Sequence, residues 1–116
     1  MSKNYVPKRH HIIWLDFEPT KGKEIGKYRP ALVLSSEQYN KQTGLLICCP
    51  ISTSIRGHQT EVLIENVKTP SVVAASIIQT LSWKNRKVKF IAIADKTVLA
   101  EVLSRLLPLI GAADYF

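Results

Sequence analysis

Arg29, Ser52 and Thr53 are the side chains whose types and positions are best suited to chemistry on a phosphate. Arg29 directly precedes Pro30, which favours an extended backbone and keeps the guanidinium at the start of a strand. A guanidinium can donate two parallel hydrogen bonds to two phosphate oxygens. Ser52 and Thr53 follow an apolar run that ends at Ile51, and hydroxyls there either cap a turn or donate to phosphate. A solvated basic loop and simple turn caps remain the alternative interpretations.

The charge balance points to a polyanionic partner. The chain has 116 residues with a formal net charge of +7 and 46% hydrophobic residues. That composition predicts one globular domain spanning residues 1–116. A basic excess of this size favours nucleic acid as the partner, then an acidic protein segment, then a membrane surface.

Cysteine and histidine usage predicts a reduced compartment and no metal site. Cys48 and Cys49 are adjacent, so in a strand they point to opposite faces and cannot easily bond each other. His10 and His11 diverge in the same way, and we expect both to be partly exposed, with only His58 as a third histidine. The amino terminus lacks the apolar core of a signal peptide, and no apolar run could span a bilayer. We therefore expect a cytoplasmic protein without a membrane partner and without a cofactor.

Apolar runs rich in β-branched residues predict a mainly β protein. The segment 71–81 fits one long strand or two short strands broken near Ala75–Ser76. The other predicted strands are 12–17, 31–34, 45–51, 61–64 and 88–94. Short strands of this number predict a small, mostly antiparallel β-barrel.

Two helices are expected to decorate the barrel. A short one follows the hydroxyl cap at Ser35–Ser36 and ends at Thr43–Gly44. A closing amphipathic helix begins after Asp95 or Thr97, because apolar residues recur at three-and-four spacing from Val98 onward. Pro108 is costly inside a helix, which predicts that this helix ends near residue 107.

The segment 83–89, WKNRKVK, mixes an aromatic residue with four cations. Such a mixture is typical of nucleic-acid surfaces, where bases stack on rings and cations meet phosphates. Lys84 and Arg86 are therefore candidate binding residues. Trp83 fits a surface ring or the edge of the core with lysines beside it.

Several segments together resemble the MazF/PemK (Kid-like) toxin family. The similarity extends from residue 5 to residue 111. It is most specific where the WxDFxPTKGxE pattern combines with RPAxVLS. The matching segments include 13–22 with Glu24, 29–35, 39–40, 43–44, 49–53, 61–62 and 82–83.

The resemblance implies an SH3-like barrel of the CcdB/Kid/MazF type that forms a homodimer. It implies a sequence-specific, metal-independent endoribonuclease, an mRNA interferase that cleaves single-stranded RNA. Such proteins are the toxins of type II toxin–antitoxin systems, and a small acidic MazE-like antitoxin holds them inactive.

The resemblance also implies site residues. The family's catalytic arginine matches Arg29 and its catalytic threonine matches Ser52, with Thr53 as a possible substitute hydroxyl. Glu24 is a candidate general base, or alternatively a partner of Lys21 or Lys27. We expect RNA contacts from Phe17, Thr20, Lys21, Lys27, Tyr28, Arg56, Lys84 and Arg86.

The sequence departs from the family pattern at three places. His10–His11 replaces a Gly-Asp pair, and Ser52 replaces threonine. Ser76–Ile77 replaces an Asp-Gln pair that shapes the dimer and the RNA groove in relatives. The last departure leaves the recognised RNA sequence unpredicted.

Two alternatives to the nuclease hypothesis follow from these observations. One is a weak or inactive homologue that binds RNA or antitoxin without cleavage. The other is a DNA gyrase poison of the CcdB type, which shares the barrel. The chain keeps the Arg-Pro-Ala segment at 29–31 that such poisons lack and does not have their Trp-Gly-Ile-like end, so the gyrase hypothesis ranks last.

Overall fold

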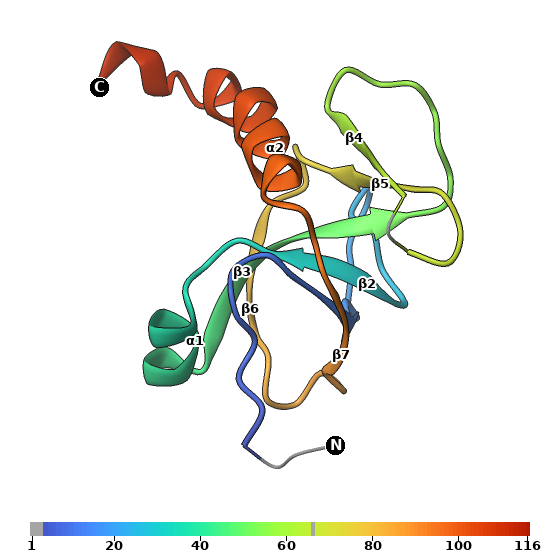
Figure 1. Cartoon of the computed structure of the whole chain (residues 1–116), viewed down its shortest axis with the longest axis vertical. Coiled ribbons are helices and arrows are strands. Elements are labelled where there is room, and N and C mark those ends of the chain that lie inside the picture. Colours follow the sequence, from blue (N-terminus) through green and yellow to red (C-terminus); the bar gives the residue numbers. More distant parts are fainter. Residues whose placement is uncertain (1–3, 66) are drawn as a thin grey trace.

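The computed structural model describes residues 4–65 and 67–116. These residues form a curled antiparallel sheet with two α-helices (Figure 1). The strands are β1 (His11–Asp16), β2 (Tyr28–Val33), β3 (Leu45–Ser52), β4 (Glu61–Ile64), β5 (Ser71–Ala74), β6 (Gln79–Ser82) and β7 (Lys89–Ile93). The helices are α1 (Glu37–Thr43) and α2 (Lys96–Leu109), followed by a short 3-10 turn η1 (Ala112–Asp114).

Strand β3 holds the sheet together. The strand order is β4-β5-β3-β2-β1-β7, and β6 also pairs with β3. One edge of β3 pairs with β2, while β6 pairs with its first half and β5 with its end. All of these pairings are antiparallel. The arrangement confirms the predicted mainly β, SH3-like barrel with two helices.

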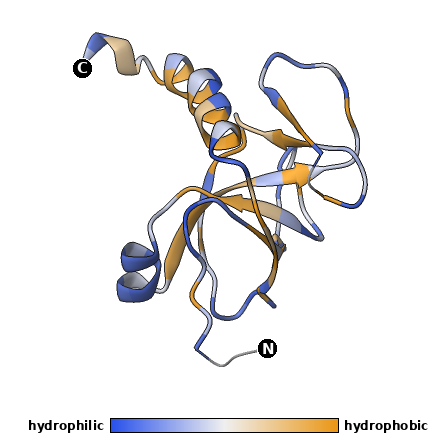
Figure 2. Ribbon diagram, in the orientation of Figure 1, coloured by the Kyte–Doolittle hydropathy of each residue, from blue (hydrophilic) through white to orange (hydrophobic). Residues whose placement is uncertain are grey.

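The two faces of the sheet bury two separate core clusters. Leu32 and Cys49 face the cluster that includes Val102 of α2. Their neighbours Val33 and Cys48 face the other cluster, which is closed by Trp83 and other residues of β1 and β2. Figure 2 shows the strands as largely hydrophobic and α1 as largely hydrophilic. Because alternate residues of β2 and β3 are buried on opposite faces, these strands read as nearly continuous apolar runs.

The predicted strands all occur, with informative differences at their ends. The segment 71–81 forms two strands, β5 and β6, separated by a turn at Ala75–Ser76. Strand β2 starts at Tyr28 rather than Ala31, because its pairing with β1 continues through Leu15↔Arg29. Arg29 therefore belongs to a strand, and its side chain is half-buried rather than carried by an exposed loop.

Both helices begin as predicted, but α2 is longer. Ser36 caps α1 by accepting from the Tyr39 amide, and Gly44 ends it in the left-handed conformation with φ 71. Helix α2 runs to Leu109, so the prediction that it ends near residue 107 is wrong. Pro108 sits in the last turn, where it removes one amide donor, and the Ile110 amide still bonds the final carbonyls.

His11 was predicted to be partly exposed, and this is wrong. Its side chain is buried, and its Nδ1 lies 2.8 Å from the Tyr5 hydroxyl. The Phe90 ring packs edge-on against the imidazole. Burial is the main cause that lowers the pKa of His11, with Lys8 as the next cause. The amino-terminal segment folds over the start of β1, and its Tyr5 covers His11. The sequence around His11 had suggested an exposed side chain.

The described residues also bear on cysteine chemistry and membrane insertion. Cys48 and Cys49 are buried free thiols in different core clusters, as their adjacency predicted. Burial raises the pKa of the Cys49 thiol to about 12. Neither helix in this part of the chain has the length and apolar character required to cross a bilayer.

Asn40 is a buried polar residue whose loss we expect to destabilise the fold. Its side chain accepts from the Ser35 hydroxyl at 2.5 Å and donates to the Pro7 carbonyl at 2.8 Å, with no exposed surface. Asn40→Ala leaves both partners unsatisfied, so we expect the free energy of unfolding to fall by about 2–3 kcal/mol. Urea denaturation measures this change. The exposed Gln42→Ala on the same helix is the control, with an expected change within about 0.5 kcal/mol; equal losses would contradict the assigned role.

Candidate active site

The register between β2 and β3 brings Arg29 and Ser52 to the same end of the sheet. Ala31 lies opposite Pro50, and Val33 opposite Cys48. Continued by two residues, this register sets Arg29 opposite Ser52. Residues that lie opposite each other in an antiparallel pair point to the same face. On that continuation, the side chains of Arg29 and Ser52 leave their strands toward the same face of the sheet.

That shared face also carries one of the core clusters. Ala31 and Val33 of β2 and Cys48 of β3 belong to the cluster that Trp83 closes. Arg29 and Ser52 occupy the next positions with the same orientation along their strands. The two polar side chains therefore sit where the buried face of the sheet meets solvent.

Arg29 is held by its own strand and the preceding loop. Its Nε donates to the Gly26 carbonyl at 2.6 Å. The side chain is half-buried, and this burial lowers the pKa of the guanidinium. A guanidinium has five N–H donors in a rigid fork, so this bond anchors one edge and leaves donors for an anion.

Ser52 is better placed than Thr53 to act with Arg29. The Ser52 Oγ accepts from the Ser54 amide at 3.0 Å, which fixes the oxygen and leaves its proton for donation. Thr53 is exposed and follows the last residue of β3. Ser52 is still part of the strand and has the same orientation as Pro50 and Cys48, which favours it as the hydroxyl on the Arg29 side.

The loop between β1 and β2 is tied to itself by carboxylate bonds. Glu18 Oε1 accepts from the Lys27 amide at 2.7 Å, and Asp16 Oδ1 accepts from the Glu18 amide at 3.0 Å. The Phe17 amide donates to the Lys27 carbonyl at 3.0 Å. These bonds fix the position of Gly26, whose carbonyl anchors Arg29.

Glu18 and Asp16 were not among the predicted site residues. Their role depends on Glu18 reaching the amide of Lys27, nine residues away. No local pattern in the sequence marks that contact, because it exists only once the loop has closed. Pro19, directly after Glu18, does indicate a turn. It does not indicate which backbone amide the Glu18 carboxylate will bind.

Glu24, the candidate base, has a structural contact of its own. Its carboxylate accepts from the Lys21 amide at 2.6 Å, and its amide donates to the Lys21 carbonyl at 3.1 Å. The predicted alternative, pairing with Lys21, therefore occurs through the backbone rather than through the ammonium group. Glu24 lies exposed on the loop that also carries Lys27.

Arg86 and Tyr28 connect this loop to the segment before β7. Arg86 Nη1 donates to the Asp16 carbonyl at 3.0 Å and to the Glu18 carbonyl at 2.8 Å. The Tyr28 hydroxyl donates to the Lys87 carbonyl at 2.8 Å, and its ring stacks on Trp14 at 5.3 Å between centroids. Both residues predicted to contact RNA thus also support the fold of the loop.

The remaining predicted RNA contacts are dispersed. Phe17 is 1% exposed and belongs to the core, so its ring is not available at the surface of this chain. Trp83 is also buried, which selects the core-edge interpretation of that residue. Thr20, Lys21 and Lys27 lie on the β1–β2 loop, Arg56 on the loop after β3, and Lys84 beside Trp83.

The chain is similar to known proteins of one toxin family. A family model described as "PemK-like, MazF-like toxin of type II toxin-antitoxin system" matches residues 8–110. The Endoribonuclease toxin MazF of Escherichia coli K12 is 38% identical over 86 residues, covering 74% of this chain and 78% of that protein.

Solved structures agree with this assignment. The crystal structure of MazF from Deinococcus radiodurans superposes with a TM-score of 0.89 at 41% identity, covering 93% of this chain and 99% of that one. A MazE–MazF crystal structure from the same organism gives a TM-score of 0.81 at 37% identity, covering 93% and 98% of the two chains. The fold and the family match together define a small β-barrel toxin. The chain belongs to the PemK-like, MazF-like toxins of type II toxin–antitoxin systems.

A side chain at Gly26 would collide with the side chains of Glu18 and Thr20. A Cβ there would lie 2.2 Å from Glu18 Oε1 and 2.8 Å from Thr20 Oγ1. We expect Gly26→Ala to displace Glu18 and expose the Lys27 amide, with hydrogen exchange at that amide faster by roughly tenfold, the size of one hydrogen bond. Amide exchange followed by NMR measures the effect.

Glu18→Ala provides the matched background for this test. It removes the Lys27 bond by itself, so adding Gly26→Ala should change exchange at Lys27 little further. A full additional tenfold increase in the double variant would show that Gly26 does not act through Glu18.

Proposed function

We propose that this chain is a sequence-specific, metal-independent endoribonuclease that cleaves single-stranded RNA. The observation that supports the proposal is the register of β2 and β3, which pairs Ala31 with Pro50 and, continued by two residues, would set Arg29 level with Ser52. The similarity to MazF proteins named as endoribonucleases supports it. The net charge of +7 suits a polyanionic substrate.

The chemistry proceeds by attack of a ribose 2′-hydroxyl on the adjacent phosphorus. The P–O5′ bond breaks, which gives a 2′,3′-cyclic phosphate and a 5′-hydroxyl end. The protein must stabilise a phosphorane-like state that carries more negative charge than the ground state. Arg29 supplies that charge from a fixed position, and the Ser52 hydroxyl donates to a nonbridging oxygen.

Proton transfer requires a group other than Arg29. A guanidinium stays protonated at working pH, even where partial burial lowers its pKa as at Arg29. Glu24 is the candidate base because its loop also carries Lys27 and leads to Arg29. The substrate itself is the alternative acceptor of the 2′-hydroxyl proton.

Cations around the site would hold the rest of the RNA. Lys21 and Lys27 on the β1–β2 loop and Arg56 on the loop after β3 are exposed near the ends of β2 and β3. Such side chains position the backbone by phosphate contacts and make binding dependent on salt. Thr20 and Tyr28 complete the set proposed on this side of the molecule.

We also propose the partners implied by the family. Exposed apolar side chains on β4, β7 and the end of α2, among them Leu63, Ile93 and Leu109, suit a homodimer interface. The MazE–MazF structures contain an antitoxin, and a basic toxin suits an acidic one. A toxin acting on mRNA works in the cytoplasm.

Arg29→Ala should remove RNA cleavage without unfolding the protein. Loss of one preorganised donor to the reacting group costs on the order of a hundredfold or more in rate. Removing the half-buried aliphatic part of the Arg29 side chain should also lower the free energy of unfolding by about 1 kcal/mol, which thermal unfolding measures. Cleavage is followed on a long unstructured RNA in EDTA. Arg29→Lys, which keeps the charge and loses the fork, should retain intermediate activity.

Two outcomes would oppose this assignment. Wild-type cleavage rates in Arg29→Ala would remove Arg29 from the mechanism. Intact RNA with the unaltered protein at equimolar concentration would favour the homologue that binds without cleaving.

Ser52→Ala should slow cleavage by on the order of a hundredfold, because it removes a donor to the phosphate. Ser52→Thr should keep the activity, since threonine retains the hydroxyl. Thr53→Ala is the matched control and should lie within a few-fold of the unaltered protein. Single-turnover rates in EDTA measure all three, and a large loss confined to Thr53→Ala would transfer the role to that residue.

A further inference from the structure

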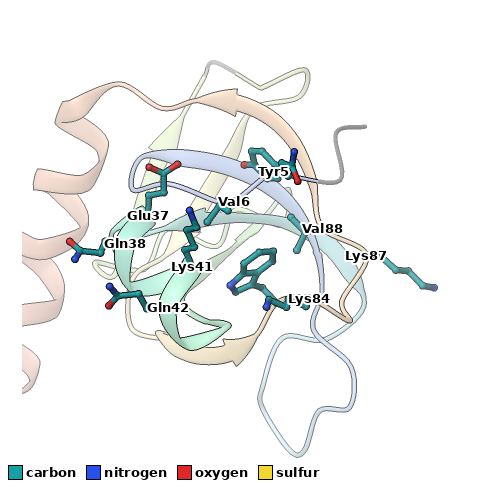
Figure 3. A pocket seen from close by; sticks show the side chains of 11 residues that line it. Tyr5, Val6, Glu37, Gln38, Lys41, Gln42, Lys84, Lys87 and Val88 are labelled. Carbon is teal, nitrogen blue, oxygen red and sulfur yellow. The ribbon is translucent and has the colours of Figure 1, made fainter.

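A groove of about 1260 Å³ lies between helix α1, residues 4–6 and the segment 83–88. It opens beside the first residues of β3, since α1 leads directly into that strand. Ser52 lies at the other end of the same strand. Neither Arg29 nor Ser52 is among the residues that line the groove, which Figure 3 shows from close by.

The groove is positively charged. Lys41, Lys84 and Lys87 line it, and Glu37 is the one acid among its lining residues. The Glu37 carboxylate lies 3.6 Å from the Lys8 ammonium, so its charge is already balanced. Figure 3 shows the Lys41 side chain on the ribbon of helix α1 and Lys84 on the facing segment. The net charge of the lining favours an anionic occupant.

The other polar lining groups suit nucleotide bases. Gln38 and Gln42 of α1 line the groove and are exposed. A side-chain amide carries two donors and one acceptor group, which can pair with the edge of an unstacked base. The Lys84 ammonium lies 6.0 Å from the Trp83 ring centre, so its stem follows the indole and its charge stays at the rim.

The segment 84–87 connects this groove to the candidate active site. Arg86 donates to the Asp16 and Glu18 carbonyls. The Lys87 carbonyl accepts from the hydroxyl of Tyr28, the neighbour of Arg29 in β2. A single strand that leaves Arg29 across this segment meets Lys87 and then Lys84. This continuity favours RNA over an acidic peptide as the occupant.

We propose that the groove between α1 and residues 83–88 binds the part of a single-stranded RNA that flanks the cleaved bond. Lys41 and Lys84 contact phosphates, and the glutamine amides contact bases. This inference rests on the proposed endoribonuclease function, and it adds a binding site remote from the reacting phosphate. Binding there raises affinity for long RNA without altering the chemical step.

The test uses RNA that cannot be cleaved. A 2′-O-methyl RNA lacks the attacking hydroxyl, so its binding is measured without turnover. Two lengths are compared by fluorescence anisotropy: about 20 nucleotides and about 6, which bracket single-strand sites on small β-barrels. Lys41→Ala with Lys84→Ala should weaken binding of the long RNA by roughly tenfold and of the short RNA by less than about twofold.

Salt dependence gives a second readout. Each lost phosphate contact lowers the slope of log affinity against log salt by about 0.7 for a single strand, so the double variant should lose about 1.4. The control is Lys68→Ala with Lys96→Ala, which removes the same charge from exposed positions outside the groove. The control pair should leave both affinities and the slope nearly unchanged.

The outcomes separate the two proposals. Weaker binding of the long RNA alone supports the groove, even if the unaltered protein cleaves no RNA. Three results would overturn the groove proposal. The double variant could lose the same affinity for the long and the short RNA, the control pair could lose as much affinity as the double variant, or neither RNA could bind the unaltered protein. Unchanged RNA binding with weakened poly-glutamate binding would also overturn it and assign the groove to an acidic protein segment.

Discussion

The antiparallel register between β2 and β3 is the constraint on which the candidate active site depends. It pairs Ala31 with Pro50 and Val33 with Cys48, and its continuation sets Arg29 level with Ser52. A slip of one residue would turn one strand's side chains to the opposite face. The register is held because both faces of these strands are buried, in two different clusters. Packing of the core thus fixes the geometry of the chemistry.

The loop before β2 adds a second level of positioning. Arg29 donates to the Gly26 carbonyl, and Gly26 is placed by the bond from Lys27 to Glu18. Arg86 then ties the start of the loop to the segment before β7. A guanidinium already anchored along one edge loses less conformational freedom when it binds a phosphate. Residues expected to contact RNA therefore also preorganise the residue proposed to act on it.

The sequence predicted the elements well, because apolar periodicity records which faces are buried. Long-range contacts explain what it missed. Tyr5 covers His11, which adjacency alone suggested was exposed. Trp83 is buried because its indole donates to the Asn40 carbonyl across 43 residues of sequence. Arg29 was identified by its residue type, its proline neighbour and the family resemblance. That Arg29 lies level with Ser52, 23 positions later in the sequence, follows only from continuing the strand register.

The proposed mechanism requires the Arg29 guanidinium and the Ser52 hydroxyl to bind one phosphodiester. A crystal structure of the protein with an RNA that carries a single 2′-deoxy nucleotide at the mapped cleavage position tests it most directly. We predict that the phosphate at that position accepts hydrogen bonds from both side chains, at about 2.7–3.2 Å. The opposite result is a phosphate at the cleavage position that only Arg29 or only Ser52 contacts. If the second side chain then points to a different face of the barrel or dimer, the proposed mechanism is wrong.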